Sequence, residues 1–172
     1  MGIGLEHTSD PVAAIYEAAL PQVYGYLLSR CGSVAVAEDL TADTFMAAVA
    51  ATRERRVEEL TVGWLVAVAR HKLVDHWRRR GREQRALAAA ERETEQAEDP
   101  WNGVLDTDAA LAALAQLSGP QRAALTLRYL DALPVASVAA HLDRSLHATE
   151  TLLVRARAAL RRVYEERSQD EP

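Results

Sequence analysis

The side chains best suited to chemistry gather between residues 61 and 85, where cations and aromatic rings interrupt an aliphatic pattern. Residues 70–85 hold seven Lys and Arg against two acids, a local charge of +5 in a chain of net charge −5. Cations bind phosphates and aromatic faces stack on unpaired bases, so this composition fits a nucleic-acid contact. A solvated basic helix face is the ordinary alternative for such a charge run. Other parts of the sequence must decide between the two.

The same segment is patterned as a helix. Apolar residues recur at spacings of three and four over residues 62–73, Thr61 is placed to cap the first turn, and no proline follows. One face should therefore be buried while the cations remain on the other. Trp64 and Trp77 fit either the core or the exposed face, because tryptophan is usually well buried.

Enzyme signatures are missing from the sequence. Its five histidines form no His-Glu-x-x-His pair, and no glycine-rich phosphate loop or Gly-x-Ser-x-Gly elbow occurs. The single Cys31 allows no internal disulfide, fits a reducing compartment and reads best as a small buried hydrophobe. We therefore expect no metal, no cofactor and no catalysis. The N-terminus lacks signal-peptide features and no apolar run could span a bilayer, so a cytoplasmic location without membrane insertion is expected.

Few glycines and prolines among abundant Ala, Leu, Arg and Glu predict an all-α fold. Asp10 and Pro11 open a first helix, in which Pro21 should force a break or a kink. Gly32 and Ser33 should end that helix and cap a second one over 34–51. With the helix after Thr61, these elements form one helical domain at 8–85.

Residues 86–105 are acidic, contain Pro100 and show no sustained apolar period, so they read as a linker. A second helical domain is expected at 106–164, followed by a polar tail at 165–172. A capping box at Ser118–Gln121 starts one of its helices, which ends near Leu133 and Pro134. Shorter and longer helices then follow at 135–142 and 146–163.

The interval 135–163 has the layout of a helix-turn-helix, although a plain helical hairpin is the simpler alternative. Asp143 stands where such a turn often has glycine, and aspartate tolerates the left-handed backbone better than most residues. Leu146 is expected to face the core. The last helix should turn six residues outward, with chemistry suited to base edges: His147, Glu150, Thr151, Val154, Arg155 and Arg161.

Together these segments resemble a bacterial sigma factor of the extracytoplasmic-function group, which retains only sigma domains two and four. The resemblance rests on AEDLTADTF (37–45), GWLVAVARHKLVDHWRRR (63–80) and LSGPQRAALTLRYLDALPVASVAAHL (117–142), which leads into ATETLLVRARAAL (148–160). It covers roughly residues 10–163, and the two signatures occur in the expected order. It implies two all-α domains joined by an acidic linker, with domain two at 8–85 and domain four at 106–164.

The resemblance also implies roles for residues at matching positions. Contact with and melting of the minus-ten promoter element fall to Trp64, Arg70, His71, Lys72, His76, Arg78, Arg79 and Arg80. Reading of the minus-thirty-five element falls to His147, Thr149, Glu150, Thr151 and Arg155. Docking on the polymerase falls to Glu38, Asp39, Leu40, Asp43 and Phe45. Glu150 departs from the Lys or Arg of many relatives, and Asp143 replaces their turn glycine.

The implied partners are core RNA polymerase, through its beta-prime clamp helices and beta flap, promoter DNA, and an anti-sigma factor or other inhibitor. The expected function is promoter-specific transcription initiation as a polymerase subunit. One alternative from another class remains, a stand-alone helix-turn-helix regulator that binds an operator as a symmetric dimer.

Overall fold

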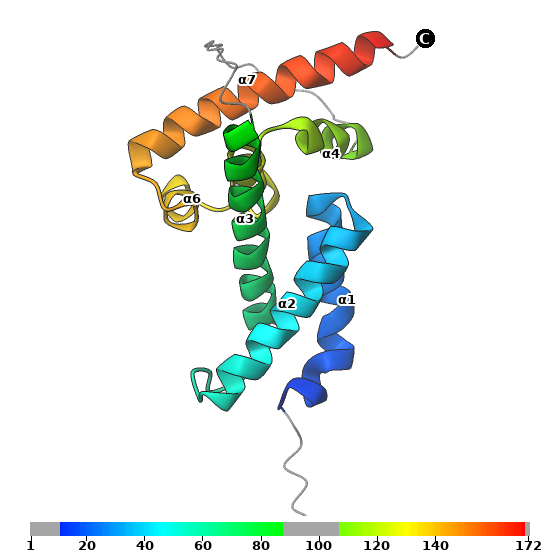
Figure 1. The fold of residues 1–172 in the computed structure, drawn as a ribbon, viewed down its shortest axis with the longest axis vertical. Helices are drawn as coiled ribbons and strands as arrows, with labels where there is room; N and C mark the ends of the chain where they lie inside the picture. The colour runs from blue at the N-terminus through cyan, green and yellow to red at the C-terminus, as the bar shows by residue number, and fades with distance from the viewer. Residues whose placement is uncertain (1–10, 88–106, 171–172) are drawn as a thin grey trace, which may run out of the picture. The chain divides into compact units, whose positions relative to one another are not determined.

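The computed structural model describes residues 11–87 and 107–170, and every regular element in those ranges is helical (Figure 1). The all-α prediction is therefore confirmed. Contacts divide the chain into two compact units, with the division between Lys72 and Leu73, inside α3. The elements are α1 (Pro11–Cys31), α2 (Val34–Arg53), α3 (Val62–Leu87), α4 (Thr107–Gln116), α5 (Gly119–Leu125), the π-helix η1 (Thr126–Leu130), α6 (Val135–Leu142) and α7 (Leu146–Asp170).

In the first unit α1 packs against α2. The α1 side chains of Val23 and Leu27 are fully buried, and the Tyr16 ring lies 4.8 Å from the Phe45 ring of α2, centroid to centroid. Of the predicted break or kink at Pro21, the break is wrong, because α1 continues through this residue to Cys31. Pro21 removes one backbone donor, but it lies on the exposed side of a helix whose other side is buried on both flanks of the proline.

The predicted end of α1 and the predicted starts of α2 and α3 are confirmed, whereas α2 ends at Arg53, two residues later than expected. Gly32 follows α1 in the left-handed conformation, with φ of 64°, and Ser33 caps α2 by accepting a hydrogen bond from the Val36 N–H at 3.5 Å. The Thr61 hydroxyl accepts from the Trp64 N–H at 3.1 Å and so caps α3. These caps fix where the two helices that carry the candidate residues begin.

In the second unit α7 is the common support, since it contacts α4, α5 and α6. Its buried side consists of Thr149, Leu153 and Ala156, which repeat at spacings of four and three. The capping box before α5 is present, with the Gln121 side chain accepting from the Ser118 N–H at 3.3 Å. Sequence periodicity did not predict that α5 would pass into the π-helix η1.

The helix-turn-helix is present as α6, a short turn and α7. Asp143 adopts φ 52° and ψ 53°, which confirms the predicted left-handed position at the end of α6. Ala132, before α6, is also left-handed, with φ of 53°. The expectation that Leu146 faces the core was wrong, because its side chain is 51% exposed. Leu146 is the first residue of α7, and the buried side of that helix begins only at Thr149.

Ala132 offers a direct test of this backbone geometry. A non-glycine residue in the left-handed region costs about 1–2 kcal/mol, part of which glycine offsets by its greater freedom in the unfolded chain. Ala132→Gly should therefore raise the free energy of unfolding by about 1 kcal/mol, measured by urea denaturation. Ala140→Gly, at an exposed site inside α6, is the control and should lower it by about 1 kcal/mol. Destabilisation by both changes would contradict the left-handed assignment.

Candidate nucleic-acid interface

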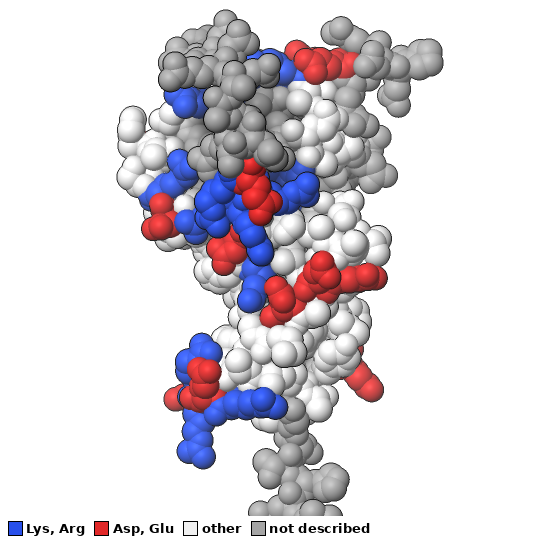
Figure 2. All heavy atoms as spheres, in the orientation of Figure 1, with Lys and Arg blue, Asp and Glu red and all other residues white. Residues whose placement is uncertain are grey.

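One side of α3 is buried at every fourth residue, which leaves its polar residues on the other sides. Leu65, Ala69, Leu73 and Trp77 are at most 2% exposed. Trp77 is thus a core residue. This decides between the core and the exposed face for one of the two tryptophans. Lys and Arg side chains gather over the middle of α3 in the space-filling view (Figure 2). This burial pattern positions the cations of α3 at the surface.

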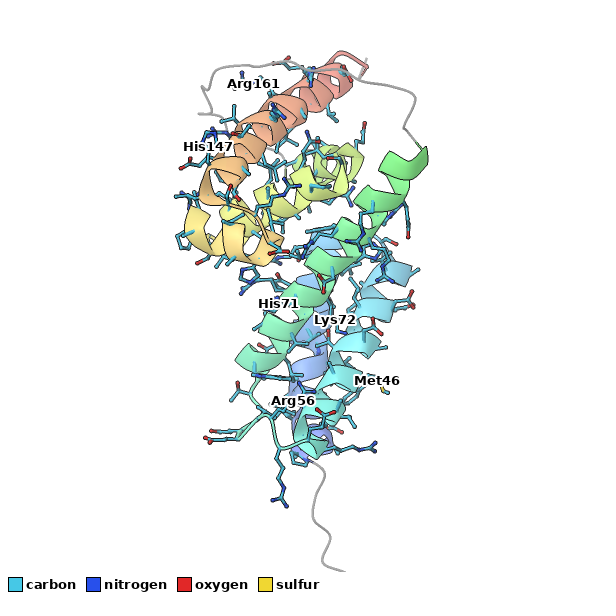
Figure 3. The ribbon with its side chains drawn as sticks, turned by 60° about the vertical axis from the view of Figure 1, so that its left-hand side comes forward. Met46, Arg56, His71, Lys72, His147 and Arg161 are labelled. Atoms are coloured by element: carbon cyan, nitrogen blue, oxygen red, sulfur yellow. The ribbon has the colours of Figure 1, made fainter. Side chains whose placement is uncertain are left out.

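The eight predicted minus-ten residues differ in accessibility. The exposed ones are His71, Arg79 and Arg80. The half-buried ones are Trp64, Arg70, Lys72, His76 and Arg78. Figure 3 shows His71 and Lys72 projecting to different sides of α3, as expected for helical neighbours. Arg78 is also 3.8 Å from the Asp75 carboxylate, one turn earlier. The eight residues therefore do not form one uniform contact surface, and Arg79 and Arg80 are the most accessible arginines among them.

The environment of His76 on α3 shifts the pKa of its imidazole. Burial lowers the pKa of His76 below its ordinary 6.5, and the positive charges of Arg80 and Arg79 lower it further. The imidazole is therefore neutral at pH 7. A neutral imidazole has one donor and one acceptor nitrogen, so His76 adds hydrogen-bonding capacity rather than charge to this face.

The acidic residues of α2 form a second candidate surface. Glu38, Asp39 and Asp43 are exposed, whereas Leu40 is 4% and Phe45 7% exposed. Leu40 and Phe45 therefore lie beneath this surface, in the core of the first unit. The sequence analysis missed Met46, whose side chain is 68% exposed and projects from α2 (Figure 3). Its spacing from Asp39 and Asp43, seven and three residues, could have placed it on the same face.

The predicted minus-thirty-five residues on α7 fall into two groups by burial. His147, Glu150 and Arg155 are exposed, and His147 projects outward near the start of α7 (Figure 3). Thr149 is fully buried, and its hydroxyl donates to the Ser145 carbonyl at 2.9 Å. Thr151 is half-buried and donates to the His147 carbonyl at 3.0 Å. Both threonine hydroxyls are thus used inside the helix, and Thr149 has no surface for a duplex.

No group of three or more His, Cys, Asp or Glu residues able to hold a metal ion occurs among residues 11–87 and 107–170. Within the same described residues, no helix is both long and apolar enough to cross a bilayer. The candidate surfaces are accordingly surfaces of charge, hydrogen bonding and apolar contact.

Comparison with known proteins matches both halves of the chain to one family. Residues 15–83 match the family described as Sigma-70 region 2, and residues 107–160 match Sigma-70, region 4. The chain is also 32% identical over 165 residues to the ECF RNA polymerase sigma factor BldN of Streptomyces coelicolor. The chain belongs to the extracytoplasmic-function (ECF) sigma factors of the sigma-70 family. The matched region is 90% of this sigma factor and 61% of that relative's length.

One solved structure agrees with this family in its fold. The sigma factor RpoE from Bartonella quintana, in its co-crystal with the anti-sigma factor NepR, is 25% identical, with a TM-score of 0.54. The similarity covers 88% of this sigma factor and 95% of that chain. A structure of an RsbN–BldN complex is 28% identical over 88% of this sigma factor and 90% of its chain, with a TM-score of 0.34.

The family regions fall on the described helices. Region 2 begins within α1, covers α2 and ends within α3, close to the end of its cationic run. Region 4 begins with α4 and ends within α7, beyond His147, Glu150 and Arg155. Each candidate surface of this sigma factor therefore lies inside a family region.

The environment of His76 predicts how stability depends on pH. Because the pKa of His76 is lowered in the folded protein, the unfolded chain binds more protons below the ordinary value of 6.5. The stability that His76 contributes is present above that value and is lost as the pH falls through the lowered pKa. His76→Gln should flatten this slope in urea denaturation measured from pH 7.5 to 5.

The cause of the shift is tested on single residues by NMR titration. Arg80→Gln should raise the pKa of His76, because it removes one of the cations that lower it. Arg30→Gln, at an arginine of α1 stacked on Tyr26, is the matched control and should leave the pKa of His76 unchanged. An unchanged pKa of His76 in Arg80→Gln would contradict the electrostatic cause.

Proposed function

We propose that this sigma factor binds core RNA polymerase and directs promoter-specific transcription initiation, without catalysis of its own. The observation that carries the proposal is the pairing of region 2 with a cationic helix and region 4 with a helix-turn-helix. Two tethered contacts with DNA gain specificity that neither has alone. The protein acts in the cytoplasm, where the polymerase and the chromosome are found.

In this proposal residues 8–85 form domain two, which binds polymerase and engages the minus-ten element. Residues 106–164 form domain four and read the minus-thirty-five element. The linker at 86–105, most of which lies outside the described residues, connects the two domains, and a polar tail at 165–172 follows domain four. These boundaries follow the change in composition and agree with the order of the two family regions.

Opening of the minus-ten region would fall to α3. Melting requires phosphate contacts that hold the displaced strand and groups that receive unstacked bases. The exposed Arg79 and Arg80 are placed to contact phosphates. His71, His76 and the half-buried Trp64 offer hydrogen bonds and one aromatic face along the same helix. Arg70, Lys72 and Arg78 complete the cationic set.

Docking on the polymerase would fall to the acidic face of α2. Glu38, Asp39 and Asp43 give it negative charge, and the flexible apolar side chain of Met46 adapts to a partner. A basic complementary surface, which we assign to the beta-prime clamp helices, suits this composition. Domain four would bind the beta flap.

An inhibitory protein is the remaining partner. The co-crystallised relative from Bartonella quintana is bound by an anti-sigma factor, NepR. We propose that this sigma factor likewise has an anti-sigma factor or other inhibitory partner, which occupies surfaces needed for transcription. Such an inhibitor would compete with polymerase for the exposed acidic and apolar residues of α2.

Charge reversal on α2 tests the polymerase-subunit proposal. The double change Asp39→Lys, Asp43→Lys should weaken binding to bacterial core polymerase about tenfold, one decade being about 1.4 kcal/mol. Fluorescence anisotropy of the labelled sigma factor measures this affinity. Glu166→Lys, at an exposed acid on α7, is the matched control and should bind normally.

Normal core affinity in the double variant would remove the assignment of α2. A wild-type chain that does not bind core polymerase but binds an operator tightly as a dimer would instead support the stand-alone regulator. The two outcomes are separable because one concerns the variant and the other the native chain.

A further inference from the structure

Three residues on the exposed side of α7 form a line with unusual chemistry. Leu146, Glu150 and Val154 follow one another at spacings of four, so they lie on one side of the helix. Leu146 is 51% and Val154 38% exposed, and Glu150 between them is also exposed. We call these three residues the apolar–acidic strip. A generic phosphate-binding face would present cations along this line.

The strip is not occupied by the second unit's own packing. The buried side of α7 consists of Thr149, Leu153 and Ala156, and the strip lies on a different side of the helix. Among the described residues, none forms an ion pair or hydrogen bond with the Glu150 carboxylate. The exposed Arg144 and Arg155 flank the strip, and His147 is exposed beside it. The Glu150 carboxylate therefore lies in a basic environment, which suits a polyanion. This favours DNA over a basic protein as the partner that binds the strip.

We infer that the apolar–acidic strip reads an upstream promoter element in which a cytosine lies between two thymines. This inference rests on the proposed function and names the bases that domain four selects. The thymine C5-methyl is the apolar group of the major groove, and Leu146 and Val154 can each contact one. A carboxylate only accepts hydrogen bonds, so Glu150 fits the cytosine amino group and disfavours the acceptors of guanine.

The length of the strip sets the spacing of those bases. Leu146 and Val154 are eight residues apart, which is about 12 Å along a helix that rises about 1.5 Å per residue. With about 3.4 Å per base pair, the two thymines lie about three to four base pairs apart when α7 follows the groove. Arg144, His147 and Arg155 then contact the sugar–phosphate backbone on either side and fix the register.

Selection from a randomised upstream element tests this inference with the full-length protein. Holoenzyme assembled from bacterial core polymerase transcribes a library of promoters, and the transcribed templates are sequenced. Wild-type protein should enrich thymines on both sides of a cytosine. Glu150→Gln should also accept adenine at the cytosine position, because an amide both donates and accepts.

Removal of the thymine methyl groups is the decisive step and needs no protein variant. Replacing each selected thymine by deoxyuridine should reduce transcription about fourfold per methyl, the effect of one buried methyl-sized group. Leu146→Ala should abolish the response at one thymine and Val154→Ala the response at the other. Leu130→Ala, a 44% exposed leucine on η1, is the matched control and should keep both responses.

The outcomes separate this inference from the proposed function. No transcription from any library member would overturn the proposed function. Promoter-specific transcription without a thymine preference, or without a response to deoxyuridine, would overturn only the reading by the strip. Equal loss of activity on every element in Leu146→Ala and Val154→Ala would mean that the strip binds protein, which also overturns the inference.

Discussion

Burial of one side of α3 is the constraint that determines which of its side chains reach the surface. Its positions 65, 69, 73 and 77 are at most 2% exposed, and burial of such side chains contributes about 1.5–3 kcal/mol each for the larger ones. Because the helix is continuous from Val62 to Leu87, fixing one side fixes the direction of all others. Arg79 and Arg80 are held at the surface by this geometry, without ion pairs that would have to be broken first among the described contacts.

The same logic governs α7, with a different result. There Thr149, Leu153 and Ala156 are buried, and the opposite side presents leucine, glutamate and valine among cations. In the proposed function, α3 would offer charge and hydrogen bonds to a strand that must be opened. Helix α7 would offer methyl contacts and one acceptor to a duplex that stays closed.

Most helices could be predicted from the sequence because their signals are local. Caps at Ser33 and Thr61, the capping box before α5 and the left-handed Asp143 each depend on a few neighbouring residues. The failures depend on tertiary packing. Packing on α2 keeps α1 continuous at Pro21, and α7 leaves Leu146 outside its buried side. The minus-thirty-five role that the resemblance implied for Thr149 conflicts with its burial, which depends on packing that a local pattern does not show.

Run-off transcription tests the central claim most directly. Genomic fragments are transcribed by bacterial core polymerase with and without this protein, and new transcripts are mapped. The account predicts discrete transcripts that appear only when the protein is added, because each DNA contact is productive only on polymerase. The same transcripts with and without the protein, together with tight operator binding by the free chain, would contradict it.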